Sequence, residues 1–261
     1  MKWFEQQTVL ANFFSVLYKI PTVKIDRDAF LAEQFEKSPI KHSIIAQGPI
    51  AAGITDKELT KAAKRVINKR TRQATTVSFA AGLPGGIAMA ATVPTDTVQF
   101  LINALKMAQE LAYLYGYRDF WKLKDDTRKN ELLLFLGTML EVKGGAAAMR
   151  LLTAQHAEVV AKKMSFSAVE RAMYWPILGE IASVIVEKIT KKTMASGITK
   201  FIPLAGGFMS GGITYAALSN MGEKLHKALA DGTPYTEGKM QADVEMIKQE
   251  MKDAMPETTE K

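Results

Sequence analysis

Apolar side chains recur along most of the chain every three or four residues, which is the spacing of one face of an α-helix. Runs in which apolar and polar residues alternate, as in a half-buried strand, are almost absent, and Val23 and Ile25 give the only hint of one. The pattern therefore predicts an all-α protein, a multi-helix globule. Its clearest example is the apolar face formed by Val98, Leu101, Ile102, Leu105, Ala108, Leu111, Ala112 and Tyr115.

Capping residues mark where two of the predicted helices begin. Thr55 and Glu58 have the spacing of a capping box, and Asp96 and Gln99 repeat it. We therefore expect Asp96 to cap a helix rather than to act as a catalytic acid. Gly116 is predicted to end that helix, because glycine adopts the left-handed backbone conformation without a Cβ clash.

Two segments, residues 73–95 and 201–222, carry no charged side chain and approach the roughly 20 residues needed to span a bilayer. Both are interrupted by proline and glycine, which would leave backbone groups without partners in lipid. We expect two Gly/Ala-rich apolar helical hairpins packed centrally against each other, with re-entrant hairpins or two spanning helices as alternatives. The residues assigned to this packing are Gly82, Pro84, Gly85, Gly86, Pro203, Gly206, Gly207 and Gly211.

The apolar stretch at residues 9–18 does not have the features of a cleaved signal peptide. Glu5 stands where such a peptide carries positive charge, and no small-residue cleavage site follows. We expect this stretch to form a helix packed on the body of the protein, with a helix lying in a membrane interface as the alternative. The expected location is the cytoplasm.

Composition narrows the class of protein further. The 261 residues are 48% apolar and 23% charged, as in ordinary globular domains, which argues against wholesale disorder. The mean hydropathy of −0.02 is too low for a protein with many membrane spans. Because the chain has no cysteine, a disulfide framework, a thiolate metal site and a cysteine nucleophile are excluded.

Positive charge is concentrated near the N-terminal side of the chain. The net charge is +7, and residues 1–72 alone hold 13 basic and 7 acidic side chains. A basic cluster beside an apolar segment is typical of contact with an anionic membrane leaflet, and the alternative is a solvated helix face. We do not expect nucleic acid as a partner, because no aromatic side chain interleaves with this cluster. The cluster comprises Lys61, Lys64, Arg65, Lys69, Arg70 and Arg72.

No pattern typical of a catalytic or metal site occurs in the chain. Gly232 and Gly238 precede Lys239 as in a phosphate loop, but five residues separate the glycines where that loop has four. There are only three histidines, and we expect no metal and no cofactor. A carboxylate-based enzyme site that uses Asp96 or Glu110 stays open as an alternative.

Residues 78–117 resemble the EcsC protein family. In that family a Gly/Ala-rich segment leads into a Pro-x-Asp turn and a long helix that ends in Leu-Ala-x-x-Tyr-Gly. A second Gly-rich segment of the family is similar to residues 198–218. The resemblance implies a bacterial cytoplasmic or membrane-associated helical protein and carries over no catalytic residue. The motif positions are Pro94, Asp96, Glu110, Tyr115 and Gly116.

These observations predict a single EcsC-like helical domain over residues 1–230 and an acidic amphipathic tail helix over residues 231–261. The expected function is that of a non-enzymatic, membrane-peripheral protein that supports a bacterial transport or envelope process. Its expected partner is an anionic membrane surface or lipid, on the inner face of the cell membrane, with a membrane transporter as a further candidate. The alternatives are a protein that binds lipid or another hydrophobic ligand, and the carboxylate-based enzyme.

Overall fold

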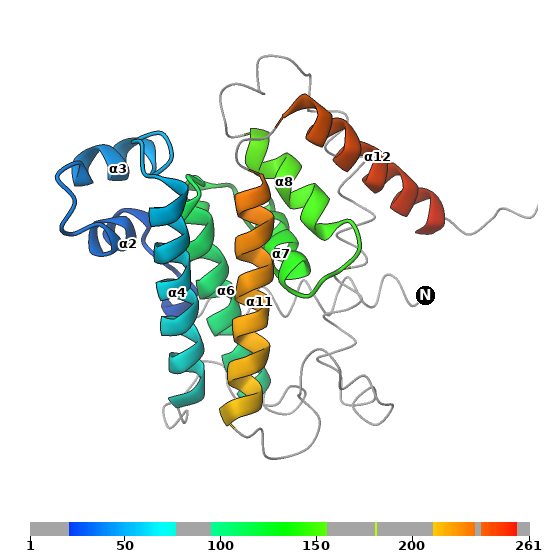
Figure 1. The fold of residues 1–261 in the computed structure, drawn as a ribbon. Coiled ribbons are helices and arrows are strands. Elements are labelled where there is room, and N and C mark those ends of the chain that lie inside the picture. Colours follow the sequence, from blue (N-terminus) through cyan, green and yellow to red (C-terminus); the bar gives the residue numbers. More distant parts are fainter. Residues whose placement is uncertain (1–20, 77–94, 156–180, 182–210, 233–235, 255–261) are drawn as a thin grey trace, which may run out of the picture.

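The computed structural model describes residues 21–76, 95–155, 181, 211–232 and 236–254, and Figure 1 shows their arrangement. Within these ranges there is no β-strand, so the prediction of an all-α, multi-helix protein is confirmed. None of the helices in these ranges combines the length and the apolar character that spanning a bilayer requires. The elements are η1 (Pro21–Val23), α2 (Arg27–Gln34), α3 (Lys41–Gln47), α4 (Asp56–Thr76), α6 (Thr95–Leu114), η2 (Phe120–Lys122), α7 (Asp125–Met139), α8 (Gly145–Gln155), α11 (Gly211–Asp231) and α12 (Glu237–Ala254).

Helix α6 is the centre of the packing. From Phe100 to Tyr115 every side chain except Lys106 is buried, and the helix lies against α4, α11, α7 and α2. A helix buried on all sides is expected to be apolar all round. The sequence pattern predicted one apolar face, and polar residues outside that face, Asn103 and Glu110, are buried as well.

The three long helices α4, α6 and α11 come into close contact at a glycine of α11. A Cβ built on Gly222 of α11 would lie 2.6 Å from the sulfur of Met107 and 2.9 Å from Cγ1 of Ile67. The backbone of α11 therefore approaches α6 and α4 more closely than any side chain would allow. Small residues permit this kind of approach, although the glycines that the sequence analysis singled out for it lie elsewhere.

Both helix ends marked by Thr55 and Gly116 are confirmed. Thr55 and Glu58 form a capping box, since the Thr55 amide donates to Glu58 Oε2 at 3.1 Å and the Glu58 amide donates to Thr55 Oγ1 at 3.4 Å. Gly116 has a φ of 82°, and the amides of Gly116 and Tyr117 donate to the carbonyls of Tyr113 and Ala112. This is the Schellman pattern that closes a helix on a left-handed residue.

Helix α6 begins at Thr95, so Asp96 lies inside its first turn rather than before it. Helix α7 begins at Asp125 and ends at Met139. A short loop follows, in which the backbone turns through Gly144, with a φ of 70°, before it enters α8.

Helices α2 and α3 form a lobe at one end of the bundle (Figure 1). Arg27 ties the lobe to the body, because its guanidinium donates to the carbonyl of Ile45 at 2.8 Å and to that of Tyr117 at 3.2 Å. Gly48, which has a φ of 90°, lies against Gly116 so closely that a Cβ on it would be 3.2 Å from the Gly116 Cα. The lobe is therefore held in a fixed position beside the end of α6.

The C-terminal helix α12 packs on α8. Ile247 of α12 is fully buried, and Met240 and Val244 pack partly against the core. Asp243, which is 4% exposed, accepts a hydrogen bond from Arg150 Nε of α8 at 2.9 Å. The amphipathic character predicted for the tail helix thus corresponds to a face that contacts the body.

Candidate functional site

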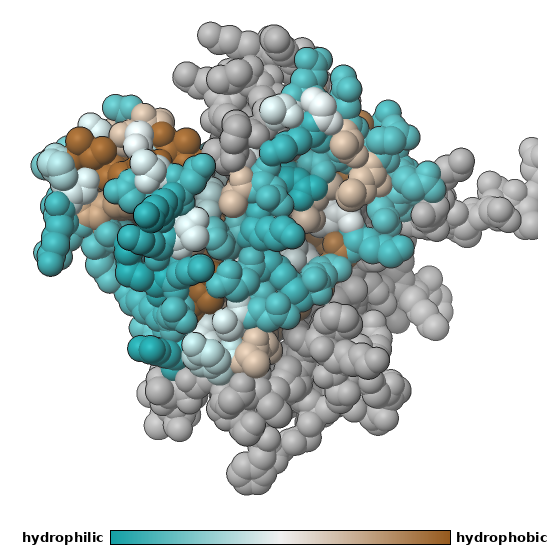
Figure 2. All heavy atoms as spheres, viewed as in Figure 1, coloured by the Kyte–Doolittle hydropathy of each residue, from teal (hydrophilic) through white to brown (hydrophobic). Residues whose placement is uncertain are grey.

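The basic residues of α4 divide into an exposed face and a buried side. Lys61, Lys64, Arg65 and Arg72 are exposed, as is Lys57 one turn earlier. Spacings of three, four and seven residues bring side chains to the same side of a helix. We call these five residues the basic face. Figure 2 shows a continuous hydrophilic surface over α4 in the view of Figure 1.

Beyond the first turn of α4, no acidic residue of this helix interrupts the basic face. The acidic residues of α4, Asp56 and Glu58, both lie in its first turn, and the Glu58 carboxylate is held by Thr55. From Lys57 to Arg72 the helix rises roughly 22 Å at 1.5 Å per residue. The face is therefore a positively charged strip about as long as two Debye lengths at 0.1 M salt.

Lys69 lies at the edge of this face and has a partner. Its ammonium contacts the Glu33 carboxylate of α2 at 2.7 Å, and the two side chains are 39% and 62% exposed. An ion pair this open to solvent contributes about 0–1 kcal/mol, so it can exchange Glu33 for another anion at little cost.

Arg70 corrects the predicted membrane-contact set, because it points into the bundle. It is 8% exposed, and its guanidinium donates to both oxygens of Glu110, with Nε 2.6 Å from Oε2. A third nitrogen donates to Gln73 at 2.9 Å. Arg70 continues the buried side of α4 that includes Val66 and Ile67, so it cannot reach a membrane surface.

Glu110 is correspondingly committed to Arg70. The carboxylate is 2% exposed and both its oxygens accept from the guanidinium, so the group acts as a structural anion between α4 and α6. One turn away, burial lowers the pKa of Lys106; the Arg70 guanidinium lowers it further and the Glu110 carboxylate opposes this. Asp96 lies at the start of α6, and its side chain is outside the described residues.

The Tyr115 position of the family motif is part of a buried contact between α6 and α11. The Tyr115 hydroxyl lies 2.9 Å from Nδ1 of His226. Burial raises the pKa of the tyrosine, and the Asp56 carboxylate adds to this. Burial lowers the pKa of His226, Glu223 raises it and Lys64 of the basic face lowers it again. Sequence reasoning had not connected these residues.

The remaining predicted residues lie outside the described part of the chain. These are Pro94 of the family motif and seven of the eight residues assigned to hairpin packing, Gly82, Pro84, Gly85, Gly86, Pro203, Gly206 and Gly207. The eighth, Gly211, is the first residue of α11. The central packing of the two hairpins therefore stays a prediction.

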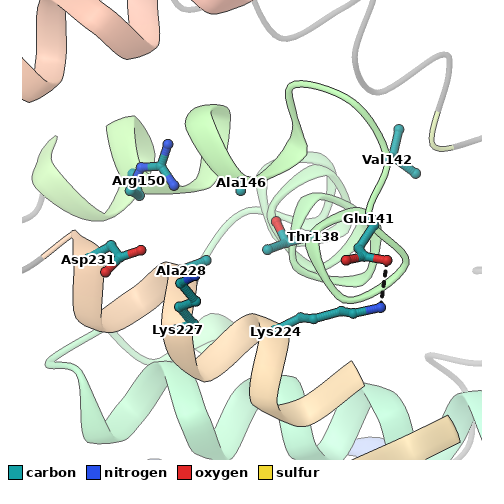
Figure 3. Close-up of a pocket in the computed structure, with 9 residues that line it drawn as sticks. All are labelled: Thr138, Glu141, Val142, Ala146, Arg150, Lys224, Lys227, Ala228 and Asp231. Carbon is teal, nitrogen blue, oxygen red and sulfur yellow. Dashed lines mark ion pairs between the residues drawn. The ribbon is translucent and has the colours of Figure 1, made fainter. Parts of the chain in front are cut away.

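A cavity of about 390 Å³ between α7, α8 and α11 was not predicted (Figure 3). Its lining includes three basic side chains, Arg150, Lys224 and Lys227, and two acidic ones, Glu141 and Asp231. Lys224 and Glu141 contact each other at 2.6 Å. Val142, Ala146 and Ala228 complete the lining with apolar side chains, so the wall is mixed in character.

Within the described ranges, no three histidine, aspartate or glutamate side chains gather where they could hold a metal ion. The chain matches no protein-family model, no curated protein and no solved structure. The resemblance to the EcsC family accordingly stays a prediction, and the candidate site rests on the geometry of α4 alone.

Proposed function

We propose that the protein is a non-enzymatic, peripheral membrane protein that binds anionic bilayers through the basic face of α4. The observation that supports this most directly is the separation of charges on that helix. Arg70 is neutralised inside by Glu110, whereas Lys61, Lys64 and Arg65 point outward, and α4 has no acidic residue beyond Glu58 in its first turn. A helix built only for solubility has no need to exclude acidic residues from three successive turns.

The size of the expected attraction supports reversible binding. Each basic side chain near an anionic leaflet contributes about 1 kcal/mol. Five such residues along roughly 22 Å can hold a protein at the surface without a spanning helix. Tyr215 of α11 is 38% exposed beside this face, where its hydroxyl donates to Asn68 of α4 at 3.3 Å. Tyrosine is enriched at the level of lipid headgroups.

Vesicle sedimentation tests this proposal. The full-length protein is mixed with vesicles of phosphatidylcholine alone or with added phosphatidylglycerol, at low salt. We expect binding only to the anionic vesicles and release as salt is raised. The variant Lys61→Glu/Lys64→Glu/Arg65→Glu should lose affinity on the order of 100-fold, because three attractions of about 1 kcal/mol each are removed.

The matched control reverses three other exposed lysines, Lys122→Glu/Lys143→Glu/Lys248→Glu. Their side chains are 74%, 70% and 61% exposed, and each makes only a long surface contact with an acidic residue. This control has the same net charge as the α4 variant and should keep most of the binding. Equal loss in both variants would show that overall charge matters rather than the basic face. Equal binding to neutral vesicles would contradict the proposal.

Under this proposal, support of a transport or envelope process would follow from membrane attachment near a transporter. That part rests on the family resemblance alone. Cell fractionation tests it first: the protein should be in the membrane fraction at low salt and in the soluble fraction after a high-salt wash.

A further inference from the structure

Ile40 occupies a position where its side chain is unfavourable for the protein alone. It is the N-cap residue of α3, where Ser, Thr, Asp and Asn are preferred because their side chains accept hydrogen bonds from the first helical amides. Ile40 makes no such bond and is 39% exposed. Residues that do not follow such local preferences are expected at functional sites, where function rather than stability selects the side chain.

The surroundings of Ile40 share this character. Between Glu36 and Asp56 the chain has no acidic residue. Ile45, Ile50 and Ile54 are only partly buried, and Ala46 and Ala51 are exposed. Figure 2 shows apolar surface on the lobe of α2 and α3, on the same side of the molecule as the hydrophilic surface of α4. We call residues 38–54 the isoleucine lobe.

The isoleucine lobe and the basic face are joined rigidly and at short range. Only Thr55 and Asp56 separate Ile54 from Lys57, the first residue of the basic face. Arg27 of α2 links this segment to the bundle, because its guanidinium donates both to the Ile45 carbonyl at 2.8 Å and to the Tyr117 carbonyl, just after α6, at 3.2 Å. An apolar element fixed beside a positive strip fits a bilayer with an anionic surface, because lipid supplies both an acyl boundary and phosphate groups.

Resting on the proposed function, we propose that the isoleucine lobe inserts into the headgroup–acyl boundary of the anionic bilayer that the basic face binds. Ile40 would lie deepest, because it is the most exposed isoleucine of the lobe. The basic face supplies long-range attraction and the lobe supplies a contact that salt does not screen. The two together would fix the orientation of the bundle on the membrane.

Because the chain has no cysteine, one engineered cysteine gives a single labelling site. The variant Ile40→Cys, labelled with an environment-sensitive fluorophore such as NBD, is added to phosphatidylglycerol-containing vesicles. We expect a blue-shifted emission, a several-fold rise in intensity and quenching by lipids that carry a nitroxide near the headgroup. The control, Lys143→Cys, labels a 70% exposed side chain between α7 and α8 and should show none of these changes.

A second variant, Ile40→Ser, removes the apolar side chain and supplies a preferred N-cap residue, so it should fold at least as well as the natural protein. We expect it to bind anionic vesicles at low salt but to be released at severalfold lower salt than the natural protein. A fluorophore at position 40 that stays in water on vesicles carrying bound protein would overturn the insertion alone. Failure of the natural protein to bind those vesicles would overturn the proposed function as well.

Discussion

The guanidinium of Arg70 holds both oxygens of the Glu110 carboxylate inside the contact between α4 and α6. The two residues are 40 positions apart and were candidates for different roles, one for membrane contact and the other for a carboxylate-based site. Their pairing removes both from those roles. The pairing also explains how the Glu110 carboxylate can lie in α6, although this helix is buried on all sides.

Breaking this pair from one side should be costly. Arg70→Met leaves the Glu110 carboxylate buried without its partner, and we expect a loss of about 3–5 kcal/mol in the free energy of unfolding by urea. Arg70→Met/Glu110→Leu replaces both groups with apolar ones and should recover most of that loss. The control Arg65→Met changes the same residue type on the exposed face and should stay within about 0.5 kcal/mol. A loss below about 1 kcal/mol in Arg70→Met would show that the pair does not stabilise the fold.

The sequence was sufficient to predict what local chemistry determines. The capping box at Thr55 and the left-handed Gly116 depend on neighbours within five residues, and both were predicted correctly. The inward position of Arg70 was also readable, because Ala62, Val66 and Ile67 set a buried side that it continues. The sequence analysis grouped Arg70 with the other basic residues by position in the chain alone. It did not consider which side of the helix each residue faces, and therefore assigned Arg70 to the exposed side of α4.

Long-range relationships could not be predicted in this way. The cavity brings Glu141 and Lys224 together from positions 83 residues apart, and no local pattern indicates which helices will be neighbours. The burial of α6 on all sides has the same origin. Glu110 and Gln109 are buried only because residues far away in the sequence, Arg70 and Val23, supply their hydrogen-bond partners.

Gly116 offers a test of backbone conformation with a control of opposite sign. Gly116→Ala forces an L-residue to a φ of 82°, which costs about 1–2 kcal/mol. A Cβ there would meet no atom within 4 Å, so the cost is conformational and not steric. Gly238→Ala, in the first turn of α12, also meets nothing and has no positive φ; it should stabilise by about 0.5–1 kcal/mol. Thermal unfolding of the two variants should therefore shift in opposite directions.

Gly222 tests the close approach of α11 to α4 and α6. Gly222→Val places a branched side chain where Ile67 and Met107 already lie within 3 Å of a Cβ. We expect a loss of roughly 1–3 kcal/mol from overpacking, measured by urea denaturation. Ala216→Val introduces the same side chain at an exposed position of the same helix and should change stability little. Equal stability of both variants would mean that the three helices can separate without cost.

The pH dependence of stability should include a contribution from His226. Burial lowers the pKa of this residue below its ordinary value of 6.5 in the folded protein, so the unfolded chain binds the proton more readily. Stability is therefore full above about pH 6.5 and falls as the pH is lowered through that value towards the folded pKa. His226→Gln keeps a polar partner for Tyr115 and removes this titration. The difference in urea midpoint between pH 7.5 and pH 5.5 should be smaller in the variant, and an unchanged difference would assign the pH dependence to other groups.

The contact between α8 and α12 decides how independent the tail helix is. Helix α11 ends at Asp231, so the predicted boundary between residues 230 and 231 falls at a helix end, and α12 then returns to the body through Arg150 and Asp243. Asp243→Ala leaves the Arg150 guanidinium, 19% exposed, without this carboxylate, which should cost about 1.5–3 kcal/mol.

Because α12 is the terminal described helix, we expect most of that cost to appear as local opening rather than as unfolding of the whole protein. Hydrogen exchange of α12 amides should accelerate on the order of 10–100-fold in Asp243→Ala while the amides of α6 keep their protection. Lys248→Ala, which removes only an exposed contact of 3.7 Å to Glu245, is the control and should leave both helices unchanged. Acceleration in α6 as well as α12 would mean that the tail helix and the bundle unfold as one cooperative unit, contrary to the separate tail predicted from the sequence.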